Sequence, residues 1–412
     1  MTFFVSLKIQ YCKTKMQELF ESQNRVLEKV NLDFKRSLYD VLPWNERAIM
    51  LMGARGTGKS TIFLQHLKEN FKTDEALYIT LDDIYFKQHT LVETARTFLQ
   101  NGGKLLLIDE VHKYPDWSRE IKNIYDLMPN LKMLFTGSSI LELQKSNADL
   151  SRRVLNYYLP ELSFREFLGI KYGLKLPKYT LEEVLTNHVE IAKDLKTKLE
   201  NPLVFFKEYL KSGAYPFFKE TNLVDIRLKQ TVNLIIDTDI PNAIPVEFST
   251  LNQLKKLLYI IAQSVPFKPN ITKLAEQVGT TRPKLYEMLK MLEAAKLIYG
   301  LYHSSTNITV LNKPEKIFLH NTNLLFVFSE NQPEMGTIRE TFFINMLESA
   351  GHKVNYTEKG DFTINNKWTF EVGGRNKTQK QISGVSNAFL ALDEIEYGYG
   401  NSVPLWLLGF MY

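Results

Sequence analysis

Cysteine is almost missing from this chain of 412 residues, since Cys12 is the only one. An internal disulfide is therefore excluded, which fits a reducing compartment. Long apolar runs are missing as well, because none approaches the ~20 residues that a membrane-spanning helix needs. The start of the chain, residues 1–7, has no basic leader and no long apolar core, so it makes a poor signal peptide. We expect a soluble, cytoplasmic protein with no membrane partner.

A strong excess of one charge is also missing. The formal net charge is only +5, so any contact with nucleic acid must come from a local basic patch. The seven histidines and the single cysteine show no C-x-x-C or H-E-x-x-H spacing, so a structural zinc site is not expected. Hydrophobic residues make up 44% of the chain, which is enough for packed cores, and the length predicts several domains.

One stretch fits the phosphate-binding pattern G-x-x-x-x-G-K-[ST] without a mismatch. An apolar run at 48–52 precedes it and a segment that can open a helix follows, as the motif requires. Glycines let backbone N–H groups converge on phosphate oxygens, and the helix start adds its positive dipole end. We predict that Lys59 reaches the β- and γ-phosphates and that the Ser60 hydroxyl ligates magnesium. The predicted nucleotide-binding residues are Gly53, Ala54, Arg55, Gly56, Thr57, Gly58, Lys59, Ser60 and Thr61.

A second motif strengthens this interpretation. The apolar run 104–108 is typical of a buried parallel strand, and it ends in Asp109 and Glu110. Ligands bind at the carboxyl ends of such strands. Asp109 is predicted to hold the magnesium ion, and Glu110 to orient and deprotonate an attacking water. The pair indicates hydrolysis by the chain itself rather than transfer of phosphate to a bound acceptor.

Two further groups of polar residues are candidates for catalysis. A predicted strand at 131–135 is followed by 136–139, where hydroxyls such as that of Ser138 could contact the γ-phosphate or the attacking water. A polar turn is the alternative, and these residues alone favour it. Arg152 and Arg153 are adjacent, and one of them could stabilise transition-state charge as an arginine finger, in cis or across a subunit boundary. A surface basic pair is the alternative, and both interpretations stay open.

These motifs together resemble one prokaryotic family, the AAA-type P-loop ATPases that are related to STAND-like ATPases. The segments that carry the resemblance are 53–60, 104–110, 136–139, 149–153 and 162–167, with 109–117 similar to the extended Walker B segment of the family. The resemblance extends from about Phe34 onward. It implies ATP and Mg²⁺ as cofactors, and the preference for ATP over GTP rests on it alone. Members often carry a C-terminal domain related to restriction endonucleases.

We predict an α/β fold class, with a parallel-sheet core and four further segments. Strands that alternate with helices indicate a parallel sheet covered on both faces, and acids at 82–83 are expected to cap the next segment. The segments are a helical lead-in at 1–44, a P-loop AAA-type core at 45–168, a helical lid at 169–249, a winged helix at 250–312 and a nuclease-like domain at 313–412. Core strands are expected at 48–52, 76–80, 104–108, 131–135 and 154–159.

The predicted winged helix has helices at 251–265 and 271–278, then a third helix that starts near Pro283 and a wing strand at 297–302. In such units the third helix enters a major groove. The side chains available for phosphates are those of Arg282, Lys284, Lys290 and Lys296. Two glutamates, Glu287 and Glu293, interrupt that face, so a purely structural role is the favoured alternative to DNA contact.

The last hundred residues resemble the PD-(D/E)xK nuclease core. Glu340 lies near the start of an expected amphipathic helix at 337–350, and Asp361 and Glu371 lie on two expected strands. The resemblance implies a second metal site formed by these three acids. Gly373 stands where the family has a lysine, so Lys377 or Lys380 would have to replace it from a neighbouring element. A nuclease and a degenerate domain used for binding or assembly both remain open.

Three functions follow from these motifs. The leading hypothesis is a Mg²⁺-dependent ATPase whose hydrolysis drives a conformational switch associated with DNA. The alternatives are an ATP-regulated DNA nuclease and a DNA-binding regulator that binds ATP but hardly turns it over. An arginine finger in trans would require at least a dimer, so a homo-oligomer or a protein partner is a further expectation.

Overall fold

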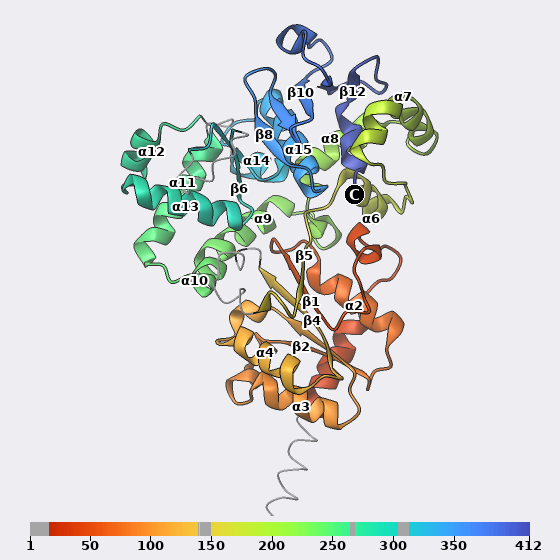
Figure 1. Ribbon diagram of the computed structural model, residues 1–412, viewed down its shortest axis with the longest axis vertical. Coiled ribbons are helices and arrows are strands. Elements are labelled where there is room, and N and C mark those ends of the chain that lie inside the picture. Colours follow the sequence, from red (N-terminus) through yellow and green to blue (C-terminus); the bar gives the residue numbers. More distant parts are fainter. Residues whose placement is uncertain (1–15, 139, 141–149, 264–267, 304–312) are drawn as a thin grey trace, which may run out of the picture. The chain divides into compact units, whose positions relative to one another are not determined.

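A computed structural model describes residues 16–138, 140, 150–263, 268–303 and 313–412 (Figure 1). Three residues of the sequence argument, Cys12, Ser139 and Asp149, lie outside this part of the chain. The chain forms two compact units. The first comprises Met1–Leu159 with Asn242–Pro245, and the second comprises Pro160–Pro241 with Val246–Tyr412.

The first unit is built on a five-stranded parallel sheet with the strand order β2-β3-β4-β1-β5. The strands are β1 (Ala48–Gly53), β2 (Ala76–Thr80), β3 (Leu105–Asp109), β4 (Lys132–Ser138) and β5 (Leu155–Tyr158). Each expected core strand is present, with small shifts at the ends. The sheet confirms the expected parallel-sheet core and fits a P-loop nucleotide-binding domain.

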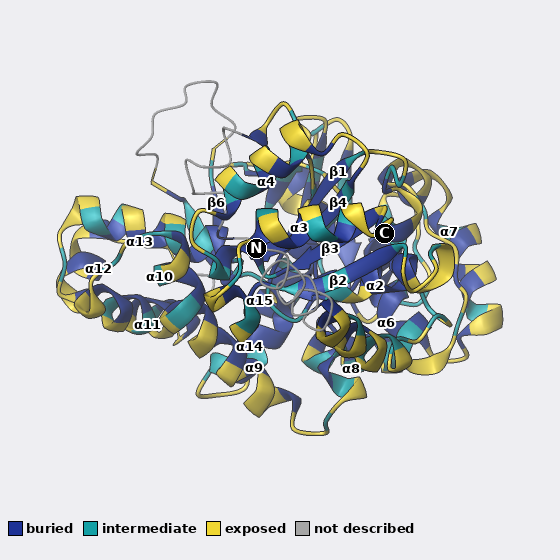
Figure 2. Cartoon of the chain, turned by 90° about the horizontal axis from the view of Figure 1, so that it is seen from below, coloured by how far each residue is buried: buried dark blue, intermediate teal, exposed yellow. Residues whose placement is uncertain are grey.

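Alternate residues of these strands enter two separate hydrophobic cores, because successive side chains of a strand point to opposite faces. Met50, Ile108 and Phe135 pack with residues of α3 (Leu91–Gln100) and α4 (Trp117–Leu127). Ile49 and Leu107 pack with α2 (Lys59–Asn70). Figure 2 shows β1, β3 and β4 as buried, whereas α3 and α4 expose their outer sides. Helices therefore cover both faces of the sheet, as predicted.

The lead-in packs against this sheet. Residues 16–28 are helical, with Met16 and Leu19 buried in one core and Leu27 against the other. A 3₁₀ turn, η1 (Ser37–Asp40), follows before β1. A second turn, η2 (Ile84–Lys87), is capped by Asp83, whose side chain accepts a hydrogen bond from the Tyr85 N–H at 2.9 Å. The expected capping role in 82–83 is thus confirmed for Asp83.

The second unit begins with helices. They are α6 (Phe164–Tyr172), α7 (Leu181–Lys198), α8 (Pro202–Ser212), η5 (Pro216–Lys219), α9 (Val224–Leu234), the π-helical η6 (Ile235–Asp239), α10 (Ile240–Ala243), which leads into the first unit, and α11 (Phe248–Gln263). The helical character expected over 169–249 is confirmed. Among the described helices, none is both long and apolar enough to cross a membrane.

Three helices and a strand pair follow one another in the segment expected to form a winged helix. After α11 come α12 (Ile271–Val278) and α13 (Arg282–Ala294), with Gly279 in the left-handed conformation between them at φ 77°. Thr281 caps α13 through a bond from the Lys284 N–H. β6 (Ile298–Leu301) then pairs antiparallel with β7 (Lys316–Leu319). One face of α13 is apolar and buried, and it consists of Leu285, Met288, Leu289 and Leu292.

The rest of the second unit is a mixed sheet with the order β12-β11-β10-β9-β8. After α14 (Thr322–Phe328) and α15 (Met335–Ser349) come β8 (Val354–Tyr356), β9 (Phe362–Ile364), β10 (Trp368–Gly373), η7 (Gln379–Ile382), β11 (Ala388–Leu392), β12 (Ser402–Pro404) and η8 (Leu405–Phe410). The strands β8, β9 and β10 are antiparallel neighbours, whereas β10, β11 and β12 run parallel.

The expectation of an amphipathic helix at 337–350 was wrong. The helix α15 is not amphipathic, because residues 341–347 are buried on every side of it. The reason is its surroundings, since α15 contacts β8 and β10 of the sheet and also α14 and η8. A helix enclosed by neighbours in this way carries apolar side chains all round.

Candidate nucleotide-binding site

The loop between β1 and α2 has the backbone that the phosphate-binding pattern predicts. Gly56 and Gly58 have φ angles of 84° and 94°, a left-handed conformation that favours glycine. Thr57 Oγ1 donates a hydrogen bond to the carbonyl oxygen of Ala54 at 2.9 Å and closes the loop on itself. Gly58 is the N-terminal cap of α2, so the loop ends at a helix start, where the first N–H groups have no partner within the helix. The backbone therefore fits a bound phosphate group.

Close packing explains the first glycine of the loop. A Cβ atom on Gly53 would lie 2.5 Å from the carbonyl oxygen of Leu159, which follows β5. That segment is fixed to β1 because the Leu159 N–H donates to the carbonyl oxygen of Met52 at 2.8 Å. Gly53 is therefore required by the neighbouring backbone as well as by the loop.

The side chain of Lys59 lies across the loop. Its Nζ is 3.0 Å from the carbonyl oxygens of Gly53 and Ala54, and the residue is only 6% exposed. Arg36 of the lead-in supports the loop from another side, because its Nη1 donates to the carbonyl oxygen of Thr57 at 2.7 Å. A buried ammonium group held at the mouth of a glycine loop suits a nucleotide phosphate. No sequence pattern indicates this role for Arg36.

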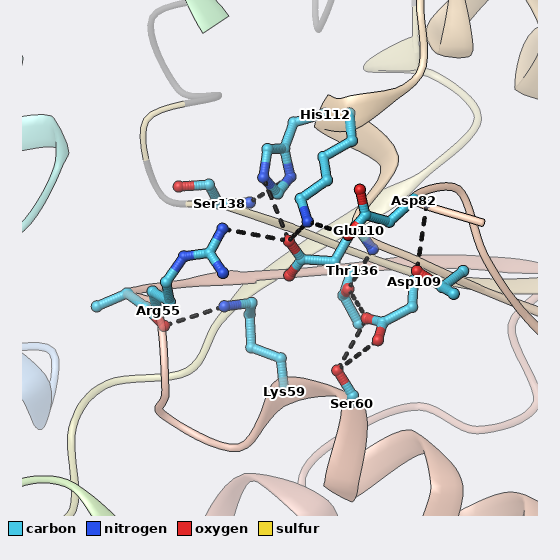
Figure 3. A network of polar contacts seen from close by, with 12 residues as sticks. Arg55, Lys59, Ser60, Asp82, Asp109, Glu110, His112, Thr136 and Ser138 are labelled. Atoms are coloured by element: carbon cyan, nitrogen blue, oxygen red, sulfur yellow. Dashed lines mark hydrogen bonds and ion pairs between the residues drawn. The ribbon is translucent and has the colours of Figure 1, made fainter. Parts of the chain in front are cut away.

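The two predicted magnesium ligands meet in the structure. Ser60 Oγ donates to both carboxylate oxygens of Asp109, each at 2.8 Å (Figure 3). The Tyr78 hydroxyl donates to Asp109 Oδ2 at 2.9 Å, and Thr136 Oγ1 donates to Oδ1. Burial, followed by the charge of Asp109, raises the pKa of Tyr78, so the phenol stays a donor. A hydroxyl and an oriented carboxylate are oxygen ligands of the kind that Mg²⁺ takes beside a phosphate.

Glu110 lies next to this pair and is surrounded by cations. Its backbone is left-handed at φ 56°, and its N–H donates to Thr136 Oγ1 at 3.1 Å. Its Oε2 lies 3.4 Å from His112 Nε2, 3.6 Å from Arg55 Nη2 and 3.7 Å from Lys113 Nζ (Figure 3). The predicted general base is thus held in place by three positively charged or protonatable groups. Lys113 also pairs with Asp82 at 2.5 Å.

Ser138 lies beside the same group of side chains. It is 6% exposed, and its backbone N–H donates to His112 Nδ1 at 3.4 Å. This contact positions the imidazole ring, whose other nitrogen faces Glu110. Thr136 contacts both Asp109 and the backbone N–H of Glu110 directly, so it has a more central place than Ser138. The sequence had pointed to Ser138 in this group and not to Thr136.

The paired arginines differ in their surroundings. Arg153 forms a bidentate ion pair with Asp126 of α4, with Nε to Oδ1 at 2.8 Å and Nη2 to Oδ2 at 3.1 Å. Arg152 is exposed in the turn before β5. The contact with Asp126 favours a structural role for Arg153, and a finger role for either arginine stays a prediction.

The three acids of the predicted second metal site interact in the second unit. Burial raises the pKa of Glu340 to about 7; Lys316 opposes this rise, and the charges of Asp361 and Glu371 add to it. Burial also raises the pKa of Glu371, which is fully buried and forms an ion pair with Lys377.

A lysine and a backbone N–H group hold the other two acids. Lys316 Nζ lies 3.4 Å from Glu340 Oε2, and Asp361 Oδ2 accepts from the Val372 N–H at 2.9 Å. Within the part of the chain that the structure describes, no group of three or more His, Cys, Asp or Glu side chains is arranged to hold a metal ion. The predicted acids therefore interact without a coordinating arrangement.

Comparisons with known proteins agree with a nucleotide-binding site at the phosphate-binding loop. Residues 45–168 match a family model described as an AAA domain. This segment is therefore similar to AAA-type P-loop domains. The match supports nucleotide binding and hydrolysis. A second segment, residues 205–334, matches a domain of unknown function.

The relatives add little about function. An uncharacterized protein of Methanocaldococcus jannaschii is 25% identical over 315 residues, which is 71% of this chain and 66% of that protein. A solved chain from work on the structural basis for katanin self-assembly is 17% identical, with a TM-score of 0.27 over 61% of this chain and 78% of its own. A DNA replication initiation factor is 14% identical, with a TM-score of 0.26 over 67% and 90%. Structural similarity this low carries no argument.

Proposed function

We propose that this protein is a Mg²⁺-dependent ATPase whose hydrolysis drives a conformational switch. The observation that supports it is the contact of Ser60 with Asp109, with Glu110 alongside and Lys59 across the glycine loop. Four residues from two separate motifs thus meet at the carboxyl ends of β1 and β3, where an open parallel sheet binds its ligand.

Each residue has a role in this proposal. The loop N–H groups and Lys59 bind the phosphates, while Ser60 and Asp109 hold the metal. Mg²⁺ would neutralise phosphate charge when it is bound with ATP. Tyr78 and Thr136 orient the carboxylate of Asp109 through their hydroxyls. Glu110 accepts the proton of the attacking water.

DNA is the proposed partner of the switch. Arg282 is exposed at the first turn of α13, and Lys284 follows it one position after Pro283. Lysines and arginines at the start of such a helix contact phosphates in winged-helix proteins. Lys290 and Lys296 belong to a different environment, because both lower the pKa of Glu293 against the effect of its burial.

The first experiment is steady-state ATP hydrolysis with and without Mg²⁺, and with double-stranded or single-stranded DNA. The wild-type chain is compared with Lys59→Ala and Glu110→Gln. Hydrolysis that needs Mg²⁺ and is lost in both variants supports the ATPase. A rate no higher than that of Lys59→Ala contradicts it and leaves a nucleotide-binding regulator as the better hypothesis.

The DNA partner is tested separately. Stimulation by DNA that is lost in Arg282→Ala, but kept in the charge-matched control Lys256→Ala on α11, supports contact through α13. Lys256 is exposed, so its removal changes the net charge equally without touching this helix. If neither DNA form changes the rate or binds, the partner is a protein instead.

A second candidate function, an ATP-regulated nuclease, has one observation in its favour. A Cβ atom on Gly373 would lie 2.6 Å from both Cβ and Cγ of Lys377. The stem of Lys377 therefore occupies the space over Gly373, and its ammonium group pairs with Glu371. A lysine from the following loop therefore lies beside the position at which the motif lacks its own, which supports this candidate. Metal-dependent DNA nicking that Glu371→Ala abolishes, while ATP hydrolysis is unchanged, would support this function; no nicking by the wild-type chain would exclude it.

A further inference from the structure

Arg55 connects the phosphate-binding loop with the predicted general base. It is the third residue of the loop after β1, whereas Glu110 follows β3. Their side chains are 24% and 22% exposed, and Arg55 Nη2 lies 3.6 Å from Glu110 Oε2. An ion pair that is partly shielded from water interacts more strongly than a fully exposed one. The loop that binds phosphate therefore contacts the acid that activates water.

The position of Arg55 gives it a second anionic partner. The loop N–H groups beside it and the ammonium group of Lys59 converge where phosphates are expected to bind. A phosphate offers more negative charge than a carboxylate, and it matches the fork of a guanidinium group. A terminal phosphate next to the loop would thus compete with Glu110 for Arg55.

Glu110 keeps other partners if Arg55 leaves it. Figure 3 shows the His112 ring and the Arg55 guanidinium group approaching the carboxylate from different sides. Lys113 is the third neighbour, and neither His112 nor Lys113 belongs to the loop. If Arg55 moved to a phosphate, His112 and Lys113 would still balance the charge of Glu110, but the carboxylate would be less restrained.

We propose that Arg55 is a positioning residue that senses the terminal phosphate. It pairs with Glu110 in the structure and moves to the γ-phosphate when ATP is bound, so that Glu110 is released for water only when there is a phosphate to cleave. The inference rests on the proposed ATPase function. It assigns to Arg55, inside the loop, the charge stabilisation that the sequence had placed at Arg152 or Arg153.

The test is equilibrium binding of ADP and of a non-hydrolysable ATP analogue, both with Mg²⁺. The wild-type chain should prefer the analogue. In Arg55→Ala this preference should fall about tenfold, the loss expected for one charge-assisted contact of about 1.4 kcal/mol, while ADP affinity changes little. Arg55→Lys should recover part of the preference, because it keeps the charge but loses the fork.

A double-mutant cycle tests the exchange itself. Glu110→Gln removes the competing carboxylate, so it should tighten binding of the analogue by about threefold in the wild-type background and leave it unchanged beside Arg55→Ala. An equal effect of Glu110→Gln in both backgrounds would overturn the exchange. If Arg55→Ala fails to fold, Arg55→Gln replaces it in the cycle.

The outcomes separate the two proposals. A wild-type chain that binds neither nucleotide contradicts the ATPase function. The wild-type chain could instead bind and hydrolyse ATP without preferring the analogue, or Arg55→Ala could keep that preference. Either result leaves the ATPase function intact and overturns the role of Arg55.

Discussion

Ser60 and Asp109 are 49 residues apart in the chain, yet Ser60 Oγ donates to both carboxylate oxygens of Asp109 at 2.8 Å. The contact follows from topology. Ser60 lies in the first turn of α2, directly after the loop that β1 opens, and Asp109 ends β3. Both strands pair with β4 in parallel, so their carboxyl ends meet at one edge of the sheet.

Asp109→Asn should abolish the effect of Mg²⁺ on nucleotide binding. The variant keeps the size of the side chain but loses the charge that holds the metal, so the gain in ATP affinity on adding Mg²⁺ should fall at least about tenfold. Ser60→Ala should have a smaller effect, since Tyr78 and Thr136 still orient Asp109. The measurement is a Mg²⁺ titration of analogue binding. Asp74→Asn, an exposed position before β2, is the control and should behave like the wild type.

Gly53→Ala should destabilise the first unit. The new Cβ atom would lie 2.5 Å from the carbonyl oxygen of Leu159 and 3.3 Å from Thr57 Oγ1, so backbone must move. We expect a loss of about 1–3 kcal/mol in the free energy of unfolding, together with weaker nucleotide binding.

The matched control for this substitution is Gly336→Ala. Gly336 lies in the first turn of α15, and a Cβ atom there would meet nothing within 4 Å. Alanine in a helix should stabilise the second unit by about 0.5–1 kcal/mol. Urea unfolding followed by hydrogen exchange measures both units, and a neutral Gly53→Ala would contradict the packing argument.

The sequence was sufficient for features that depend on local patterns. The glycine loop and the buried strands could be predicted because each leaves a continuous signature, a fixed spacing or an apolar run. The contacts of Tyr78 and Arg36 could not be predicted. A single polar residue in a strand or in the lead-in leaves no pattern that shows where its side chain points. Tertiary packing alone decides that Tyr78 reaches Asp109.

The helix α15 and the loop after β10 show the same limit in the second unit. The apolar residues of α15 were visible in the sequence, but its burial on all sides depends on neighbours that are distant in the chain. Lys377 and Lys380 were equal candidates in the sequence, and only the structure shows that Lys377 lies against Gly373 and pairs with Glu371.

The stability of the first unit should fall in acid because of His66. Its ring is 9% exposed and stacks on Trp44, with centroids 3.8 Å apart. Burial, with a smaller effect of Lys132, lowers the pKa of His66 from 6.5 to about 4, whereas Glu69 opposes the change. The folded unit therefore keeps His66 neutral at pH values where the unfolded chain binds a proton.

Protonation of the unfolded chain should lower the free energy of unfolding as the pH falls from about 6.5 to about 4, by at most about 3 kcal/mol. In His66→Phe, which keeps an aromatic ring on Trp44, this part of the pH dependence should disappear. Hydrogen exchange of the α2 amides across this range is the measurement. Equal slopes for the wild type and the variant would show that His66 is not the cause.

Glu340 should lower the free energy of unfolding of the second unit near neutral pH. Its pKa is raised from 4.5 to about 7, mainly by burial, so the folded unit binds this proton more tightly than the unfolded chain does. The free energy of unfolding should therefore fall as the pH rises from about 4.5 through about 7, by at most about 3 kcal/mol. Lys316, at 3.4 Å, offsets only part of the cost.

Glu340→Gln mimics the protonated acid, so the variant should match the wild type near pH 4 and exceed it in stability near pH 8. The measurement is urea unfolding followed through the exchange of β9 and β10 amides, with Glu358→Gln, an exposed carboxylate before β9, as the control. Variants of equal stability at pH 8 would contradict the argument. A buried acid that reduces stability, and lies beside two other acids, is typical of a functional site rather than of a packed core. If the wild type nicks DNA and the stabilised Glu340→Gln variant does not, Glu340 belongs to the nuclease. If the variant nicks as the wild type does, or if neither protein nicks DNA, Glu340 affects only the stability of the second unit.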